Sequence, residues 1–92
     1  MKQGVAFSMN DREILEFIKE YFVSTFEIPK AQIKPEARLA EDLGLDSIDA
    51  LDMSAMLEDR LDIQISEDAL REIRSIEDVI VFIRNNATQN LN

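Results

Sequence analysis

The sequence predicts an all-α domain with three main helices and one short helix, from its apolar periodicity, its capping signals and its composition. Apolar residues recur at helical spacing near residues 11–26, 47–61 and 76–83. A polar residue suited to cap a helix stands before each of these segments. The chain has 92 residues, of which 46% are hydrophobic, so it can form one small domain with a modest core.

The first helix is predicted over Asp11–Phe26 and is followed by a long loop. Asn10 and Glu13 have the spacing of a capping box, and Pro29 stands just beyond the predicted end. The apolar stripe of this helix consists of Ile14, Leu15, Ile18, Phe22 and Phe26. Residues 27–45 lack a clear period and contain both prolines and a glycine, which predicts a loop. The apolar residues that could pin this loop to the core are Ile28, Ile33, Leu39 and Leu43.

The second helix is predicted from Ser47 to about Leu61, and a short helix and a closing helix follow it. Ser66 is expected to cap the short helix, which carries Ala69, Leu70 and Ile73. Ser75 with Asp78 opens the last helix, whose apolar stripe consists of Ile76, Val79, Ile80 and Ile83. Residues 62–65 alternate briefly and could be mistaken for a strand. We expect a flexible lead over residues 1–10, a folded domain over residues 11–85 and a flexible tail over residues 86–92.

Composition excludes several classes of function. The chain has no cysteine and no histidine, which removes thiolate zinc sites, disulfides, thiol catalysis and the usual general base. Ten basic and 19 acidic residues give a net charge of −9, so nucleic acids and anionic membranes are poor partners and a basic protein surface is the natural complement. No apolar run approaches a membrane span, and the first ten residues are too weakly apolar for a signal peptide. A monomer in the cytoplasm is therefore expected.

The most informative segment is Asp46-Ser47-Ile48-Asp49, where a glycine-containing loop meets the second helix. Asp46 is a good N-cap, and Asp49 lies three residues later, where a carboxylate favours the positive helix start. If Asp46 caps the helix, the Ser47 hydroxyl is free at the first turn and suited to attachment of another group. The alternative is that Ser47 itself is the N-cap and has no further role.

The second helix has two apolar faces when its residues are placed at about 100° per residue. Its expected core face consists of Ala50, Met53, Leu57 and Leu61. An outer stripe on the opposite side consists of Ile48, Leu51 and Ala55. The outer stripe is flanked by Asp52, Glu58 and Asp59, which predicts an apolar docking strip whose acidic rim attracts a basic partner. Burial of the outer stripe under the long loop or against the short helix is the alternative.

The acidic residues near Ser47 do not indicate a metal site or a catalytic centre. Asp42, Asp46, Asp49 and Asp52 lack the alternating ligands, central glycine and terminal glutamate of a calcium loop. Nothing in the sequence identifies a substrate pocket for a pair of catalytic carboxylates. We therefore expect no metal ligands, no catalytic residues and no enzymatic activity.

Residues 41–49, with the sequence EDLGLDSID, resemble the modification motif of acyl carrier proteins. The resemblance extends over about residues 11–85 and includes the acidic second helix, the Ile-x-Ile link and the order of the helices. It implies a four-helix bundle in which Ser47 carries 4′-phosphopantetheine. A carrier-protein synthase would add this arm from coenzyme A, and the terminal thiol of the arm would hold acyl groups as thioesters.

The resemblance also implies two sets of binding residues. The residues carried over as docking positions are Asp46, Ile48, Asp49, Leu51, Asp52, Ala55, Glu58 and Asp59. The residues that could line an acyl-chain pocket between the second and third helices are Met53, Leu57, Ile63, Ile65, Ala69 and Ile73. For the second set, ordinary core packing is an equal alternative. Arg60 and the small Ala55 depart from the common pattern of the family and bear on which partners are recognised.

Three functions are compatible with these observations. The first is a discrete acyl carrier protein that serves acyl-transferring, condensing and modifying enzymes of fatty-acid synthesis or of a related specialised lipid or polyketide pathway. The second is a carrier of aminoacyl or peptidyl groups, which would use the same Ser47 chemistry. The third is an unmodified acidic helical adaptor that uses only the docking strip.

Overall fold

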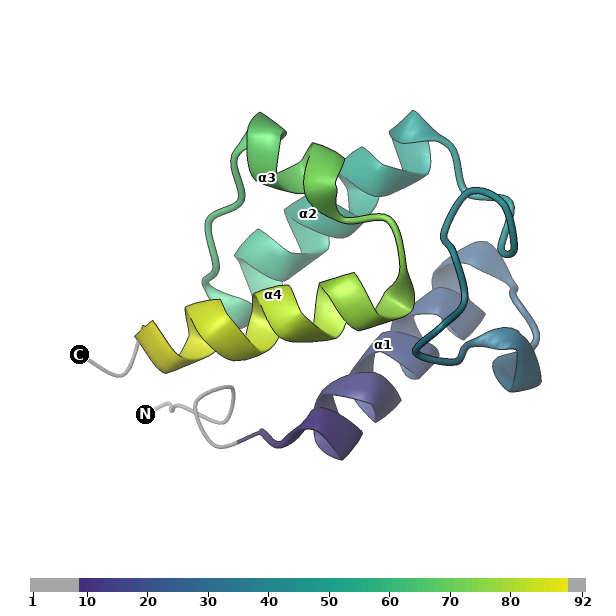
Figure 1. The fold of residues 1–92 in the computed structure, drawn as a ribbon, viewed down its shortest axis with the longest axis horizontal. Coiled ribbons are helices and arrows are strands. Elements are labelled where there is room, and N and C mark those ends of the chain that lie inside the picture. Colours follow the sequence, from purple (N-terminus) through teal and green to yellow (C-terminus); the bar gives the residue numbers. More distant parts are fainter. Residues whose placement is uncertain (1–8, 90–92) are drawn as a thin grey trace.

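The computed structural model describes residues 9–89 and contains helices α1 (Asp11–Phe26), α2 (Ser47–Leu61), α3 (Glu67–Glu72) and α4 (Ile76–Gln89) (Figure 1). One turn of 3-10 helix, η2 (Lys30–Gln32), lies in the loop between α1 and α2. Within the described residues there is no strand, and the alternating residues 62–65 are irregular. The predicted all-α fold with three main helices and one short helix is confirmed.

Local capping chemistry accounts for where the helices begin. The Asn10 side chain accepts a hydrogen bond from the amide of Glu13, and the Glu13 carboxylate accepts one from the amide of Asn10, at 2.9 and 3.0 Å. The Ser66 hydroxyl accepts the amide of Ala69 at the start of α3. Each bond satisfies a donor that the first turn of a helix leaves without an intrahelical partner. α1 and α2 therefore have the predicted bounds.

The last helix is longer than predicted. α4 continues to Gln89, so the expected boundary at residue 85 falls inside it. No glycine or proline interrupts the segment, and the Asn86 side chain donates to the carbonyl of Phe82 at 2.8 Å, so nothing local ends the helix there. The outer parts of the expected lead and tail, residues 1–8 and 90–92, lie outside the described residues.

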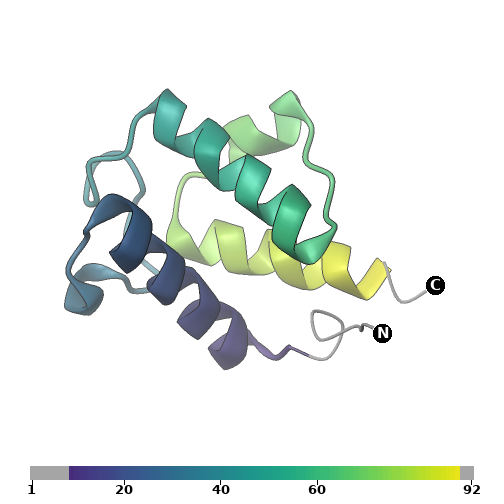
Figure 2. The same ribbon diagram turned by 180° about the vertical axis from the view of Figure 1, so that it is seen from behind.

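The core is formed by α1, α2, α4, the first loop and the link that follows α2. Its buried side chains are Ile14, Ile18, Phe22, Ile28, Ile33, Ala37, Leu39, Met53, Leu57, Ile63, Ile76, Val79, Ile80 and Ile83. α3 contributes no fully buried residue and lies on the side of the bundle away from α1, as Figures 1 and 2 show. Within the part of the chain that the structure describes, no helix is long and apolar enough to cross a membrane.

The long loop is held against the start of α4. The amide of Leu39 donates to the carbonyl of Arg74 at 2.9 Å, and the amide of Ile76 donates to the carbonyl of Ala37 at 2.9 Å. The amide of Leu45 then donates back to the carbonyl of Leu39, also at 2.9 Å. These bonds and the buried apolar residues confirm that the loop is pinned to the core. The loop therefore delivers the chain to the start of α2 in a defined position.

Candidate functional site

The start of α2 is held by a reciprocal capping box between Asp46 and Asp49. The amide of Asp49 donates to Asp46 Oδ1 at 3.0 Å, and the amide of Asp46 donates to Asp49 Oδ2 at 3.2 Å. Asp46 is thus the N-cap, and Ser47 is the first helical residue with an exposed side chain. The alternative in which Ser47 itself caps the helix is wrong, because the Asp46 carboxylate has taken that role.

The Ser47 hydroxyl differs from the other described serine hydroxyls. Ser24 and Ser54 donate to carbonyls of the preceding helical turn, at 3.4 and 3.0 Å. Ser66 and Ser75 accept backbone amides as helix caps, each at 3.1 Å. Across residues 9–89, Ser47 is the serine whose hydroxyl makes no hydrogen bond to the protein. It is therefore available as an attachment point at no cost to the fold.

Gly44 shapes the turn that leads into this site. Its φ angle of +72° lies in the left-handed region, and its amide donates to the carbonyl of Ala40 at 3.1 Å. A Cβ atom at this position would meet no atom within 4 Å. Glycine is therefore favoured by backbone conformation rather than by space. The turn sets the direction in which Asp46 and Ser47 enter α2.

The outer stripe of α2 is open to solvent. Ile48 and Leu51 are 73% and 57% exposed, and Ala55 is exposed as well. Met53 and Leu57 on the opposite face are fully buried. The predicted two-faced helix is confirmed, and burial of the outer stripe is wrong. The use of the stripe for docking stays a prediction.

The predicted acidic rim also lies at the surface. Asp46, Asp52, Glu58 and Asp59 are exposed, and Asp49 is half-buried. The Glu58 carboxylate additionally accepts the amide of Ile65 at 3.5 Å, which ties the end of α2 to the following link. The carboxylates therefore surround the outer stripe with negative charge.

Tyr21 on α1 brings a buried hydroxyl close to the acidic side of α2. Its oxygen is inaccessible to solvent and has no hydrogen-bond partner among the described residues. Burial raises the pKa of Tyr21 from 10.0 to about 12, with further contributions from the charge of Asp52, from the Asp52 carboxylate as an acceptor for the hydroxyl and from the charge of Asp49, and an opposing one from Arg60. The contact with Asp52 does not have the geometry of a formed hydrogen bond. No pattern in the sequence identified this residue, since its position depends on how α1 packs against α2.

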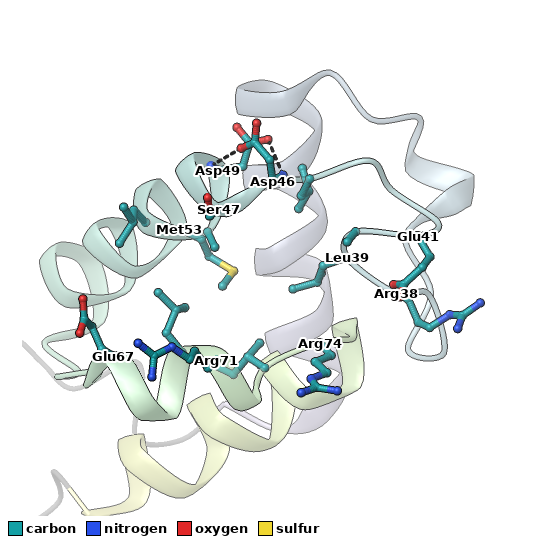
Figure 3. A pocket seen from close by; sticks show the side chains of 16 residues that line it. Arg38, Leu39, Glu41, Asp46, Ser47, Asp49, Met53, Glu67, Arg71 and Arg74 are labelled. Carbon is teal, nitrogen blue, oxygen red and sulfur yellow. Dashed lines mark hydrogen bonds between the residues drawn. The ribbon is translucent and has the colours of Figure 1, made fainter.

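A pocket of about 770 Å³ opens beside Ser47. It lies between the start of α2, residues 38–45 of the loop and the segment from α3 to Arg74 (Figure 3). Its apolar lining includes Leu39, Leu45, Ala50, Met53, Leu70 and Ile73. Its volume falls in the range of small-molecule sites. We call this cavity the Ser47 pocket.

The predicted acyl-chain residues are divided by the structure. Met53 and Ile73 line the Ser47 pocket. Leu57 and Ile63 are buried in the core, and Ile65 and Ala69 are half-buried outside the pocket lining. The assignment of these six residues to an acyl chain remains a prediction.

Three arginines in the pocket lining were not predicted from the sequence. Arg38, Arg71 and Arg74 all line the Ser47 pocket. The signal available in the sequence was the spacing of Arg71 and Arg74 at the end of the short helix in an otherwise acidic chain. Over the described residues, no three side chains of His, Cys, Asp or Glu are grouped to hold a metal ion.

Comparison with known proteins gives the family. Residues 16–83 match the family described as the phosphopantetheine attachment site. The chain is 40% identical to acyl carrier protein 2 of Ralstonia nicotianae over 77 residues, which cover 84% of this chain and 95% of that protein. The chain belongs to the acyl carrier protein family. An acyl carrier protein of Thermosynechococcus vestitus is 32% identical over the same shares of the two chains.

A solved structure supports the fold independently. The acyl carrier protein from Enterococcus faecalis, described for its high thermal stability, superposes with a TM-score of 0.71 at 24% identity. The match covers 85% of this chain and 99% of that chain. Membership in the family makes the chain a carrier rather than an enzyme, with phosphopantetheine as its prosthetic group. The resemblance and cofactor predicted from residues 41–49 are confirmed.

Proposed function

We propose that Ser47 is the attachment residue for 4′-phosphopantetheine and that the chain delivers acyl groups to cytoplasmic enzymes of fatty-acid synthesis or a related lipid or polyketide pathway. The observation that supports Ser47 is its exposed hydroxyl, which the capping role of Asp46 leaves without a hydrogen bond to residues 9–89. When attached, the arm supplies a thiol that a chain without cysteine lacks. Ser47 suits 4′-phosphopantetheine, because an exposed hydroxyl at a helix start can be joined to the phosphate of the arm without disturbing the core.

The charges at the site act in opposite directions on the phosphate of the arm. The N-terminus of α2 favours a negative group through its free amides and its dipole. Asp46 and Asp49 oppose it, but their carboxylates are held in the capping box and are not free to move away. We propose that this opposition keeps the arm away from the helix and able to reach partner enzymes.

We propose that the outer stripe and its acidic rim form the docking surface for these enzymes and for a carrier-protein synthase. Ile48 and Leu51 would supply apolar contact area, since they are the two most exposed large apolar residues described. The carboxylates of the rim would steer partners that have basic patches. We propose that the chain acts as a monomer and binds neither nucleic acid nor membranes, in keeping with its charge of −9.

Loading with an acyl group tests the proposed function. The apo protein is incubated with an acyl-coenzyme A and a carrier-protein synthase, and its intact mass is measured. We expect one acylated arm per chain, from which hydroxylamine removes the acyl group because the bond is a thioester. Failure of the chain to gain mass, while a known acyl carrier protein gains it in the same mixture, would leave the unmodified adaptor as the better explanation.

A further inference from the structure

The Ser47 pocket has opposite charges on its two sides. Asp46 and Asp49 lie with Ser47 on the α2 side, and Arg71 and Arg74 lie across the opening (Figure 3). The chain as a whole is acidic, with 19 Asp and Glu against ten Lys and Arg and a net charge of −9. Two arginines in the lining of the pocket that also contains Ser47 are therefore a local feature that the overall charge does not predict.

Of the two cations, Arg74 has the more firmly held backbone and the less engaged side chain. Its amide donates to Asp78 Oδ2 at 2.9 Å, and its carbonyl accepts the amide of Leu39, also at 2.9 Å. The backbone is thus fixed on both sides, so the side chain extends from a defined position. Over residues 9–89, the Arg74 guanidinium forms no ion pair. The Arg74 guanidinium can therefore bind an anionic group without first breaking an ion pair.

The other two arginines of the pocket are less free. Arg71 contacts Asp68 at 3.3 Å, but the two side chains are 73% and 93% exposed, so this pair contributes little and a new anion can replace it. Glu67 lies beside Arg71 in Figure 3 and weakens its positive field. Arg38 is paired with Asp42 and extends on the other side of the opening. The expected order of contribution is therefore Arg74 before Arg71.

Apolar side chains separate the two charged sides. Met53 lies between Ser47 and the arginines in Figure 3, and Leu70 and Ile73 line the α3 side. An apolar passage suits an acyl chain, whereas a carboxylate placed midway would lose its hydration without gaining a partner. The arrangement therefore matches an acyl chain whose far end is anionic, with the charge at Arg74.

We propose that the Ser47 pocket selects acyl groups with a carboxylate at the far end over acyl groups of the same length that end in a methyl group. This inference rests on the proposed function, because the cargo must be tethered at Ser47 to reach the pocket. The apolar passage holds the chain, and Arg74 with Arg71 binds the terminal carboxylate through charge-assisted hydrogen bonds. The phosphate of the arm is not the ligand meant here, since it lies on the Ser47 side beside Asp46 and Asp49.

The test compares two cargos of equal carbon number on the same protein. One is the monothioester of a medium-chain dicarboxylic acid, and the other is the methyl-ended acyl group, each loaded from its coenzyme A thioester. Intact mass confirms loading, and amide chemical shifts of residues 70–74 report the fraction of cargo in the pocket. We expect the carboxylate cargo to occupy the pocket more, with a difference that shrinks as added salt screens the arginines.

Variants assign the selection to the arginines. Arg74→Gln and Arg71→Gln should each reduce the ratio of pocket occupancies by about twofold to fivefold, the range for an exposed ion pair. Arg74→Lys keeps the charge and should retain part of the preference. Arg12→Gln is the matched control, because Arg12 is exposed on α1 outside the pocket and should leave the ratio unchanged.

The outcomes separate this inference from the proposed function. Equal occupancy by both cargos on a correctly loaded protein would overturn the selection and leave the carrier function standing. A preference that persists in the Arg71→Gln/Arg74→Gln double variant would overturn the role of the arginines. Absence of any gain in mass would overturn both proposals, since neither cargo could then reach the pocket.

Discussion

At the scale of single residues, the start of α2 depends on a division of roles between Asp46 and Ser47. The two residues compete for the N-cap position, and serine and aspartate are both good caps. The reciprocal bonds of Asp46 with Asp49 decide the competition, because they satisfy two amides at once. The Ser47 hydroxyl, which could have capped the helix, is thereby left without that role.

Tyr21 gives a prediction at the same scale. Its pKa is raised from 10.0 to about 12 in the folded chain, so the folded protein keeps a proton that the unfolded chain loses between these pH values. Stability should therefore fall as the pH rises from about 10 towards 12. Because the chain has one tyrosine and no tryptophan, phenolate absorbance measures this titration directly in native and in urea-unfolded protein.

The control for this titration is Tyr21→Phe, which removes the buried hydroxyl and keeps the aromatic ring. At neutral pH this variant should differ from the parent in its free energy of unfolding by no more than about 1 kcal/mol, since the hydroxyl forms no hydrogen bond of good geometry and only its weak contact with Asp52 is lost. It should also lack the tyrosine part of the alkaline loss of stability. A native titration midpoint close to the unfolded value would show that the hydroxyl is better solvated than the packing of α1 indicates.

At the scale of elements, the loop that ends at Gly44 sets the geometry of the attachment site. Gly44→Ala should lower the free energy of unfolding by about 1 kcal/mol, because the left-handed conformation is costly for alanine while its Cβ meets no atom. Gly44→Asn should lower the free energy of unfolding by less, since asparagine tolerates the left-handed backbone conformation. Urea unfolding measures the free energy of unfolding of both variants. If Gly44→Ala is as stable as the parent, the loop adopts another conformation at residue 44.

The proposed docking surface also belongs to one element, because the outer stripe lies on α2. Ile48→Ala and Leu51→Ala should change stability by less than about 0.5 kcal/mol, as both side chains are exposed. Each should weaken binding of a partner enzyme by roughly 1 kcal/mol or more if the stripe is the docking core. Val23→Ala is the matched control, because Val23 is the remaining exposed large apolar residue and lies on α1. Equal losses at all three positions, measured by calorimetry, would remove the docking assignment.

At the scale of the whole molecule, net charge should oppose folding. With a net charge of −9 on one small bundle, added salt should raise the melting temperature. Between about 0.01 M and 1 M salt the screening length falls from about 30 to 3 Å. We expect a rise of roughly 5 °C, which corresponds to about 1 kcal/mol for a domain of this size. A flat or falling melting temperature would show that the acids are already compensated in the fold.

The sequence predicted most of the fold because helix starts are encoded locally. The capping boxes at Asn10 and Asp46 lie within four residues each, so the starts of α1 and α2 could be predicted directly. The end of α4 could not, because no residue near position 85 stops a helix. The free hydroxyl of Ser47 and the outer stripe could be predicted from the sequence for the same local reason.

The Ser47 pocket and the burial of Tyr21 depend on tertiary packing. The pocket forms only when α3 and the segment to Arg74 lie across from residues 38–45, and this contact is fixed by backbone bonds between distant segments. The pKa of Tyr21 likewise depends on α1 lying against the acids of α2. Neither arrangement has a sequence period, so the arginines of the pocket could not be assigned a role from spacing alone.

We propose that Ser47, and no other serine, carries the arm. The parent chain, Ser47→Ala and Ser54→Ala are incubated with coenzyme A and a carrier-protein synthase, and their intact masses are measured. Ser54 is the matched control because it lies on the same helix but its hydroxyl is bonded to the carbonyl of Leu51. We expect the parent and Ser54→Ala each to gain one phosphopantetheine and Ser47→Ala to gain none. A phosphopantetheine on correctly folded Ser47→Ala would contradict the assignment.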